Sequence, residues 1–541
     1  MGEVIMQRKW IAGVAISASL FILSGCQKQV ETREWETMTM DRVSVHDPSI
    51  ESVVVDGKET FYIFGSHLAE AKSTDLIHWE VPFQSEYENP EDNLLLGNLD
   101  ENLKESFEWA GKDDADSSGG YSIWAPDVIW NADYVWQDGG KGAFMYYYSA
   151  TSTWRRSCIG FAVSKTIEGP YQYADTIVYS GFSEVDSTDG SERNIQYEQT
   201  NLKELIQNKT IKEFSSKWVR NSGQEYNTDY APNAIDPTLF YDENGKLWMT
   251  YGSWSGGVYL LEMDGKTGRP IYPGEDDMSD GKVVDRYFGT KLSGGFHQSG
   301  EGPYILYDKE SGYYYLYVTY GQLSANGGYN MRMFRSASVE GPYVDAKGNS
   351  PVLEKGEINS DFGIKVMGNY KFSTMLKAYK SAGHNSAIIR EDGAWMLVYH
   401  TRFSGSEAHE VRVHPMMLNQ DQWPVTLPFE YQSDEYRSAK VEERQMIGSY
   451  EFINHGTDNA QGVIETQTIQ LNEDYTITGD CGGTWQRNDE NFVTITFDNQ
   501  VYKGVVTAQL DEENTPKDRV VFSAIGENNE SIWGVKSEEI K

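Results

Sequence analysis

The chain has 541 residues, enough for two domains, and its 82 Asp and Glu outweigh 46 Lys and Arg to give a formal net charge of −36. This charge excludes nucleic acid as a partner, because nucleic-acid binding relies on phosphate neutralisation by Lys and Arg. It also disfavours polyanionic substrates. The 35 Tyr and 15 Trp exceed the usual needs of a core, so some are candidates to line a groove.

Residues 1–25 have the pattern of a lipoprotein signal peptide. Arg8 and Lys9 precede an apolar stretch over 10–23, which is short for a membrane span. The stretch ends on Leu23-Ser24-Gly25-Cys26, which resembles a bacterial lipoprotein cleavage site. We therefore expect Cys26 to carry a lipid and to become the mature N-terminus.

The residues after the cysteine set the expected location. Gln27 follows Cys26, where an Asp would favour retention in the inner membrane. We expect attachment to the outer membrane or the cell surface, with residues 26–39 as a tether. Translation starts at Met1 or at Met6, and the sequence leaves both open.

Three carboxylates stand before β-rich runs. They are Asp47 before Pro48, Asp236 before Pro237, and Glu301 in Gly300-Glu301-Gly302-Pro303. D-P and G-P are also common turn dipeptides, so one such acid alone predicts little. Three of them at matching positions favour one shared site. Inverting glycoside hydrolysis uses an acid and a base about 6.5–9.5 Å apart across one bond.

The acids mark a repeated unit that consists of a short strand, a turn and an aromatic-rich second strand. The second strands of its five copies are expected at 61–66, 144–149, 247–253, 313–318 and 395–400. Such a repeat predicts an all-β, five-bladed β-propeller over residues 40–430. The leading residues of the inner strands, with His384 among them, would meet at the propeller axis.

The remaining segments surround this propeller. Two polar insertions, 85–120 and 183–233, are expected to form rim loops, the second with a helix beginning near 201. A charged linker is expected over 431–447. Residues 448–541 alternate polar with apolar, which predicts a small antiparallel β-barrel or sandwich. We favour a buttressing role for this domain over glycan binding.

The chain resembles glycoside hydrolase family 43, and within it the endo-1,5-α-L-arabinanases, over roughly residues 40–430. The segments that carry the resemblance are Trp124-Ala125-Pro126-Asp127, Asn233-Ala234-Ile235-Asp236, Tyr251-Gly252-Ser253 and Ser381-Ala382-Gly383-His384-Asn385-Ser386. The resemblance implies that Asp47 is the general base, Glu301 the general acid and Asp236 the carboxylate that orients and tunes the acid. Two-domain members carry a comparable C-terminal β-domain.

The chemistry of these residue types agrees with the assignment. A base must be ionised, as Asp47 beside His46 can be, whereas an acid must keep its proton, and a neighbouring Asp236 would raise the pKa of Glu301. A retaining mechanism with Asp236 as nucleophile remains an alternative, and it would need carboxyl groups only about 5–5.5 Å apart.

The residues beside the motif strands are the candidates to bind sugar. These substrate-binding candidates are Trp124, Asp127, Asn233, Ser253 and Trp254.

A metal is expected at His384. A lone histidine in an apolar strand is usually a core residue, but the resemblance implies that this one faces an axial calcium or its water shell. Calcium prefers oxygen ligands, so one imidazole among waters makes a weak site. Five other histidines are expected to be structural: His46, His297, His400, His409 and His414.

The sequence thus predicts a monomeric, lipid-anchored hydrolase that cleaves internal α-1,5-L-arabinofuranosyl linkages of arabinan with inversion. An exo-acting α-L-arabinofuranosidase or β-xylosidase is the alternative on the same scaffold. A non-catalytic glycan-binding propeller is the alternative from another class, although a binder has no need of three clustered charges that are costly to desolvate.

Overall fold

The computed structural model describes residues 36–83, 90–112, 121, 123–153, 156–488 and 491–540. The expected signal peptide, both candidate start methionines and the lipid site Cys26 lie outside these residues. Within the described ranges, no helix combines the length and apolar character needed to cross a membrane.

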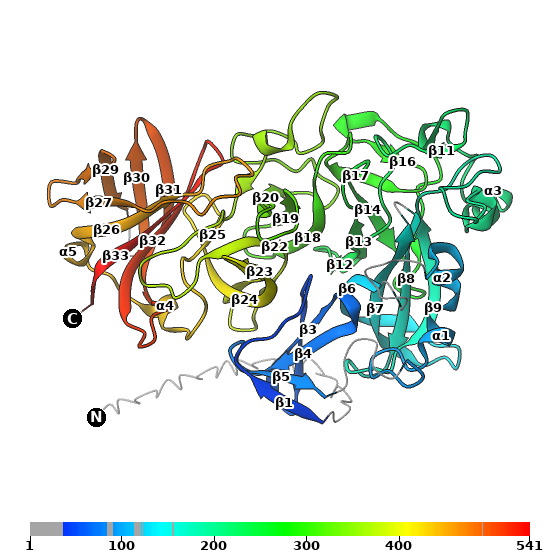
Figure 1. The fold of residues 1–541 in the computed structure, drawn as a ribbon, viewed down its shortest axis with the longest axis horizontal. Coiled ribbons are helices and arrows are strands. Elements are labelled where there is room, and N and C mark those ends of the chain that lie inside the picture. The colour runs from blue at the N-terminus through cyan, green and yellow to red at the C-terminus, as the bar shows by residue number, and fades with distance from the viewer. Residues whose placement is uncertain are drawn as a thin grey trace, which may run out of the picture.

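Five antiparallel sheets form the blades of a propeller (Figure 1). From the axis outward, the first blade contains β2 (Ser49–Val55), β3 (Lys58–Gly65), β4 (Ala69–Ser73), β5 (Trp79–Pro82) and β1 (Thr37–Met40). The second contains β6 (Ile123–Val135), β7 (Lys141–Thr153), β8 (Arg156–Ser164) and β9 (Gln172–Tyr179). The third contains β12 (Thr238–Tyr241), β13 (Leu247–Tyr251), β14 (Val258–Met263), β17 (Gly289–Ser293) and β16 (Val284–Asp285), with β15 (Pro270–Ile271) paired to β14.

The last two blades have four strands each. The fourth contains β18 (Glu301–Asp308), β19 (Tyr313–Tyr320), β20 (Asn330–Ser336) and β21 (Ile364–Lys365). The fifth contains β22 (Tyr379–Ile389), β23 (Trp395–Phe403), β24 (Ser406–Leu418) and β25 (Pro424–Thr426). The predicted five-bladed propeller is therefore confirmed.

The inner strands close into a ring. β2, β6, β12, β18 and β22 contact one another in that order, and β22 contacts β2. At this closure, Ser386 Oγ donates to the carbonyl of Pro48 at 2.7 Å. β1 pairs with β5 in the first blade, so the strand begins inside the segment expected to be a tether. Four residues of alternating Thr and Met are too short a pattern to be read as a strand.

The tyrosine-rich strands are explained by packing on both faces. Along β19, Tyr314 joins the cluster shared with the third blade, whereas Tyr315 joins the cluster shared with the fifth. Because alternate strand residues point to opposite faces, each blade buries aromatics against both neighbours. These tyrosines serve the core and not a groove.

The two insertions are more ordered than expected. The described part of the first contains α1 (Leu99–Asn102) and α2 (Lys104–Ala110), and α2 packs on β7 and β8. Leu99, Leu103 and Phe107 are buried at a spacing of four, the stripe of an amphipathic helix, so the rim-loop prediction is wrong there. The helix predicted in the second insertion is α3 (Leu202–Gln207), followed by the ribbon of β10 (Val219–Arg220) and β11 (Glu225–Tyr226).

Several short helices complete the described elements. Single 3-10 turns occupy Ser66–Leu68, Tyr197–Gln199, Ser216–Trp218, Ser279–Gly281 and Asn359–Asp361. α4 (Glu435–Ser438) and α5 (Glu443–Met446) lie in the expected linker. Tyr436 there is buried and its carbonyl accepts from Thr507 Oγ1, so this segment packs against the C-terminal domain and is not a free linker.

The C-terminal domain is a closed antiparallel barrel. Its strands are β26 (Gly448–Asn454), β27 (Gln467–Leu471), β28 (Thr476–Gly479), β29 (Gly483–Arg487), β30 (Phe492–Phe497), β31 (Gln500–Leu510), β32 (Asp518–Gly526) and β33 (Ser531–Glu539). β33 pairs with β26 to close it. The alternatives of barrel and sandwich are thus resolved in favour of a barrel.

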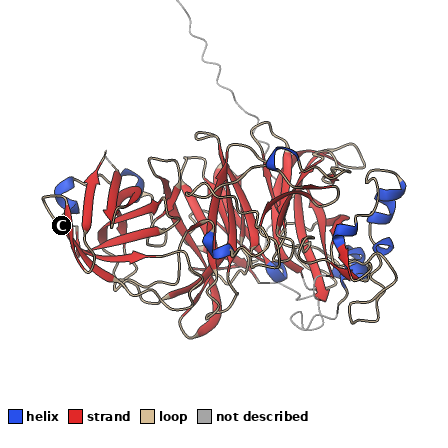
Figure 2. Ribbon diagram, turned by 90° about the horizontal axis from the view of Figure 1, so that it is seen from above, coloured by secondary structure: helices blue, strands red, loops and turns tan. Residues whose placement is uncertain are grey.

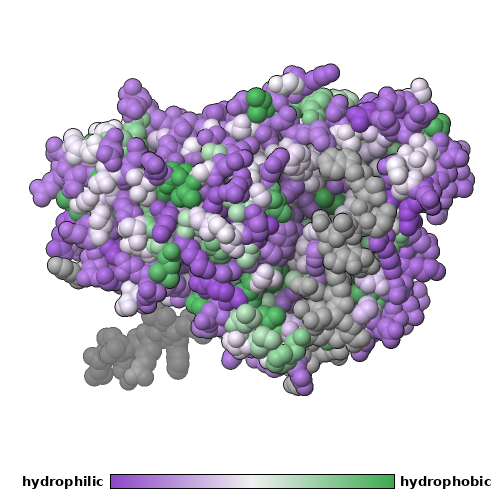
Figure 3. Space-filling view, viewed as in Figure 1, coloured by the Kyte–Doolittle hydropathy of each residue, from purple (hydrophilic) through white to green (hydrophobic). Residues whose placement is uncertain are grey.

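The barrel and the propeller share a core. They lie end to end in both ribbon views (Figures 1 and 2). Trp533 of the barrel meets Tyr370 of the propeller edge to face at 4.9 Å, and both belong to one buried cluster. Hydrophilic side chains dominate the face seen in Figure 3, as the large net charge leads us to expect.

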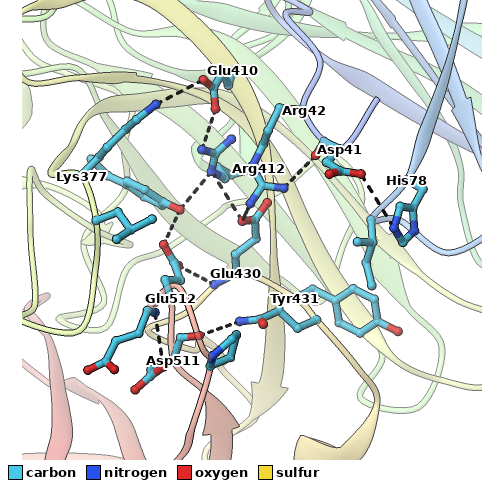
Figure 4. Close-up of a pocket in the computed structure, with 16 residues that line it drawn as sticks. Asp41, Arg42, His78, Lys377, Glu410, Arg412, Glu430, Tyr431, Asp511 and Glu512 are labelled. Carbon is cyan, nitrogen blue, oxygen red and sulfur yellow. Dashed lines mark hydrogen bonds and ion pairs between the residues drawn. The ribbon is translucent and has the colours of Figure 1, made fainter. Parts of the chain in front are cut away.

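A cavity of about 530 Å³ lies where the first blade, the fifth blade and the barrel meet (Figure 4). Glu430 Oε2 accepts from Arg42 at 2.7 Å and lies 3.6 Å from Nε of Arg412. The backbone N–H of Glu430 donates to Glu512 at 3.0 Å, and Glu512 also accepts from Tyr379. Burial, helped by the nearby Glu512 and opposed by the two arginines, raises the pKa of Glu430 to about 7.

Candidate active site

The three carboxylates gather at the axis. Asp47 and Asp236 lie just before the inner strands β2 and β12, and Glu301 is the first residue of β18. His384 lies in β22. Asp47, Asp236 and His384 have φ of 54°, 57° and 46°, a left-handed backbone that side chains other than glycine rarely adopt. Such strain concentrates at functional sites, where the surrounding structure holds it in place.

Asp47 is held as a carboxylate. Its Oδ1 lies 3.0 Å from Nδ1 of His384, and its Oδ2 lies 2.9 Å from Nδ1 of His46. Ser66 Oγ donates to the same Oδ2 at 2.5 Å. Burial works against ionisation, but His384 and His46 hold the pKa of Asp47 well below its usual range. Asp47 is therefore ionised at neutral pH.

His400 contacts the backbone of Asp47. The backbone N–H of Asp47 donates to Nδ1 of His400 at 3.1 Å, and burial holds the pKa of His400 well below its usual range. The rings of His46 and His400 stack with centroids 4.3 Å apart. Both histidines were expected to be structural, yet both contact Asp47. His46 is adjacent in sequence, but nothing in the sequence links His400 to Asp47.

Glu301 is bound at both oxygens. Its Oε1 accepts from the hydroxyl of Tyr329 at 2.6 Å. Its Oε2 accepts from Nε1 of Trp254 at 2.8 Å and from Ser253 Oγ at 3.3 Å. Ser253 and Trp254, predicted to bind sugar, thus contact the predicted acid. Tyr329 is a further site residue that the sequence did not indicate.

Asp236 contacts the backbone next to Glu301. Its Oδ2 accepts from the N–H of Gly302, the residue after Glu301, at 3.1 Å, and its own N–H donates to Ser149 Oγ at 2.9 Å. Burial, with smaller contributions from the carboxylates of Glu301 and Asp47, raises the pKa of Asp236 to about 7, while His384 opposes the rise.

His384 lies between the carboxylates. Its backbone N–H donates to Thr319 Oγ1 at 2.9 Å. Its ring covers Gly302, where a Cβ would lie only 2.8 Å from Cδ2 of the imidazole. Burial disfavours the charged ring, but Asp47, then Asp236 and Glu301, raise the pKa of His384 to about 9.

The other predicted sugar contacts lie in different surroundings. Trp124 is half-buried and meets His67 edge to face at 4.5 Å, and within the described ranges its Nε1 has no hydrogen-bond partner. Asp127 is buried, and its carboxylate accepts from Ser49 Oγ and from the N–H of Leu239.

Asp127 therefore links three inner strands, and each of its carboxylate oxygens already accepts from a donor of the protein. Asn233 is also buried, and its Oδ1 accepts from Ser180 Oγ at 3.3 Å. Polar residues beside a motif strand cannot be assigned to groove or core by sequence position alone.

Comparisons with known proteins identify the family of this chain. The family described as glycosyl hydrolases family 43 matches residues 196–424, and its C-terminal lipocalin-like domain matches residues 428–534. An extracellular endo-α-(1→5)-L-arabinanase 2 of Bacillus subtilis is 39% identical over 508 residues, which cover 91% of this chain and 93% of the relative. The chain belongs to glycoside hydrolase family 43.

Two further proteins are similar over more than nine-tenths of this chain. An extracellular endo-α-(1→5)-L-arabinanase of Thermotoga petrophila is 37% identical over 92% of this chain and 94% of the relative. The crystal structure of a family 43 glycoside hydrolase from Bacillus licheniformis superposes with a TM-score of 0.74 at 36% identity, covering 93% of this chain and 100% of that chain. Propeller and barrel thus occur together in these relatives.

The family 43 site separates two carboxyl groups by their surroundings. Asp47 faces two imidazoles that favour its ionised form, whereas Glu301 faces neutral donors from Tyr329, Trp254 and Ser253. Pairs of carboxyl groups in different environments are the usual basis of acid and base roles. Asp47 and Glu301 are such a pair by their surroundings.

Two sets of side chains at this site have donors for a metal. His46, Asp47 and His400 bring one ligand atom each within 4.8 Å of one another. Two nitrogens and one oxygen suit a transition metal better than calcium. The surroundings of His384 are richer in oxygen, because three carboxylates act on its ring.

Proposed function

We propose that this family 43 chain hydrolyses internal α-1,5-L-arabinofuranosyl linkages of arabinan with inversion of configuration. The observation that carries the proposal is the pair of differently held carboxyl groups, Asp47 between two imidazoles and Glu301 between three neutral donors. The two relatives named endo-arabinanases, which match nine-tenths of the chain, support the choice of substrate.

The reaction is a single displacement. Asp47 takes a proton from a water molecule, whose oxygen forms a bond to the anomeric carbon as the bond to the leaving oxygen breaks. Glu301 gives its proton to that oxygen, so the electron pair of the broken bond ends in a hydroxyl group. Asp236 does not exchange a proton in this scheme. It holds the N–H of Gly302 and thereby fixes the backbone that carries the acid.

A calcium ion beside His384 is part of the proposal. The site fits a hard cation in charge, because the carboxylates of Asp47, Asp236 and Glu301 all interact electrostatically with a single imidazole. When bound, the ion supplies positive charge that stabilises the clustered carboxylates. With its Nδ1 facing Asp47, the ring would bind the ion through Nε2, which must first lose its proton. Calcium affinity should therefore rise with pH.

Metal analysis of the purified protein tests the proposed calcium site. The wild type should retain calcium after gel filtration, and His384→Ala should retain less while remaining folded. Equal calcium in both proteins, or none in either, would remove His384 as a ligand.

The proposal also covers the location of the protein. The relatives are named extracellular, and Cys26 follows the lipoprotein-like sequence described above. A lipid on Cys26 would hold the monomeric enzyme at the cell surface. The wild type should incorporate labelled palmitate and sediment with membranes, and Cys26→Ser should do neither. Release of the unaltered protein into the medium would refute anchoring.

Viscometry and product analysis on debranched arabinan test the activity. An endo-enzyme lowers viscosity early and releases mixed short oligosaccharides, and Glu301→Gln should do neither. Release of arabinose alone with little change in viscosity would identify an exo-enzyme. The absence of any product would leave a glycan-binding propeller.

A further inference from the structure

The barrel contacts the fourth blade through one loop. Residues 455–466, which connect β26 to β27 and are called the barrel loop below, lie against β20 and β21. Arg332, which is fully buried, donates from Nη2 to the carbonyl of Asp458 at 3.3 Å and to Oδ1 of Asn459 at 3.1 Å. Lys365, also buried, donates to the carbonyl of Asp458 at 2.7 Å. Two buried cations of the propeller thus hold the loop.

The same loop fixes both residues that flank Tyr329. A Cβ at Gly328 would lie 2.3 Å from the carbonyl oxygen of Asn459, so the two backbones are in close contact. On the other side, Asn330 Nδ2 donates to Oδ1 of Asn459 at 3.0 Å. Between these two contacts, Tyr329 directs its hydroxyl to Oε1 of Glu301.

A second connection reaches the fifth blade. Asn369 donates from Nδ2 to the carbonyl of Gln461 and accepts at its own carbonyl from the N–H of Ile464, both in the barrel loop. Its side-chain oxygen accepts from the N–H of Ser381 at 2.7 Å. Ser381 begins the stretch of β22 that leads to His384.

We infer that the barrel loop is a positioning element for hydrolysis, in which Asn459 holds residues 328–330 so that Tyr329 keeps Glu301 directed at the leaving oxygen. The inference rests on the proposed hydrolase function and assigns the barrel a part in it other than glycan binding. Tyr329 is a positioning residue. Burial keeps the pKa of its hydroxyl far above the usual range, so it remains a hydrogen-bond donor.

The rate of hydrolysis depends strongly on the position of the general acid. A displacement of about 1 Å from a productive geometry costs on the order of 100-fold. Loss of the Tyr329 hydroxyl frees one oxygen of Glu301 directly. Loss of the Asn459 amide loosens the segment that carries Tyr329, and we expect a smaller effect.

Leaving-group dependence separates misplacement of the acid from general damage. An arabino-oligosaccharide has a poor leaving group that requires protonation, whereas a dinitrophenyl α-arabinobioside leaves without it. Tyr329→Phe should lower kcat on the oligosaccharide about 100-fold and Asn459→Ala about tenfold, with KM unchanged. Both variants should cleave the aryl substrate at close to the wild-type rate.

Four further variants sharpen the test. The double variant should lose no more than Tyr329→Phe alone, because Asn459 acts through Tyr329. Asn459→Asp keeps the acceptor oxygen and should retain the wild-type rate. Glu465→Ala, at an exposed position of the same loop, is the matched control and should change nothing. Asn330→Ser removes the same hydrogen bond from the propeller side if Asn459→Ala melts early.

Three results would overturn the inference. They are equal losses on both substrates, additive losses in the double variant, or full activity of Asn459→Ala and Asn330→Ser. Each of these results would leave the barrel with a purely structural role. If the wild type cleaves neither substrate, the proposed function itself fails, and that outcome is distinct from these.

Discussion

Replacing His46 by Phe should move the acidic limb of the pH profile of kcat/KM to higher pH. The catalytic base must be ionised, and His46 is one of two imidazoles that hold the pKa of Asp47 down. Phe keeps the ring that stacks on His400 at 4.3 Å, but it removes the hydrogen bond to Asp47 Oδ2. The pKa of Asp47 then rises, and the enzyme loses activity at a pH where the wild type is still active.

The size of the shift follows from the contact that is lost. A hydrogen bond to a charged group contributes about 1.5–3 kcal/mol, which corresponds to about one to two pKa units. The bond here is 2.9 Å long, while His384 and Ser66 keep their contacts with Asp47. We therefore expect the lower end of this range, about one pH unit.

The assay is kcat/KM on an arabino-oligosaccharide between acidic and neutral pH. His409→Phe is the matched control, because His409 meets His46 edge to face at 4.9 Å and hydrogen-bonds to Ser44 but not to Asp47. Its acidic limb should coincide with that of the wild type. An unchanged limb in His46→Phe, with activity reduced equally at every pH, would show that Asp47 does not depend on His46 for its ionisation.

The remaining predictions concern the acids, the inner ring and the domain junction. Asp47→Asn and Glu301→Gln should each lower kcat by about 10²–10⁴-fold, because each removes a proton-transfer group. Calorimetry should still detect arabino-oligosaccharide binding to both variants. Turnover of Asp47→Asn above about a tenth of the wild-type value would exclude Asp47 as the base. Asp127→Ala leaves two buried donors unpaired, so the free energy of unfolding should fall by about 1–3 kcal/mol, with KM unchanged. Urea titrations measure this loss. A raised KM at unchanged stability would instead support the predicted contact of Asp127 with sugar. Glu430 has a folded pKa of about 7, above its unfolded value, so the folded state binds the extra proton and the free energy of unfolding should fall as pH rises from about 4.5 to 7. Glu430→Gln should flatten this fall, and an identical pH dependence in both proteins would contradict it.

Sequence alone was sufficient to predict the propeller because its signals are local. Each unit has its own strand, turn and aromatic strand within about thirty residues, and β19 shows why the aromatic strand is buried on both faces. The acids Asp47, Asp236 and Glu301 were found as the leading residues of these units, and the structure places them together at the axis.

The partners of the acids were not predictable in the same way. His400 lies 353 residues from Asp47 along the chain, and only ring closure brings them together. Tyr329 lies in the connection just before β20, and only tertiary packing, to which the barrel loop contributes, directs it to Glu301. Trp254 and Ser253 were located correctly beside the site, but their donors point to the acid. The helices of the first insertion, by contrast, carried a readable stripe of Leu99, Leu103 and Phe107.

The anomeric configuration of the first product tests the central account most directly. Proton NMR of arabinan hydrolysis, recorded before mutarotation, reports which anomer forms at the new reducing end. Single displacement, with Asp47 as base and Glu301 as acid, predicts the β-anomer first and the α-anomer only later by mutarotation. Initial release of the α-anomer would show two successive displacements through a covalent intermediate, and it would contradict the roles assigned to these carboxyl groups.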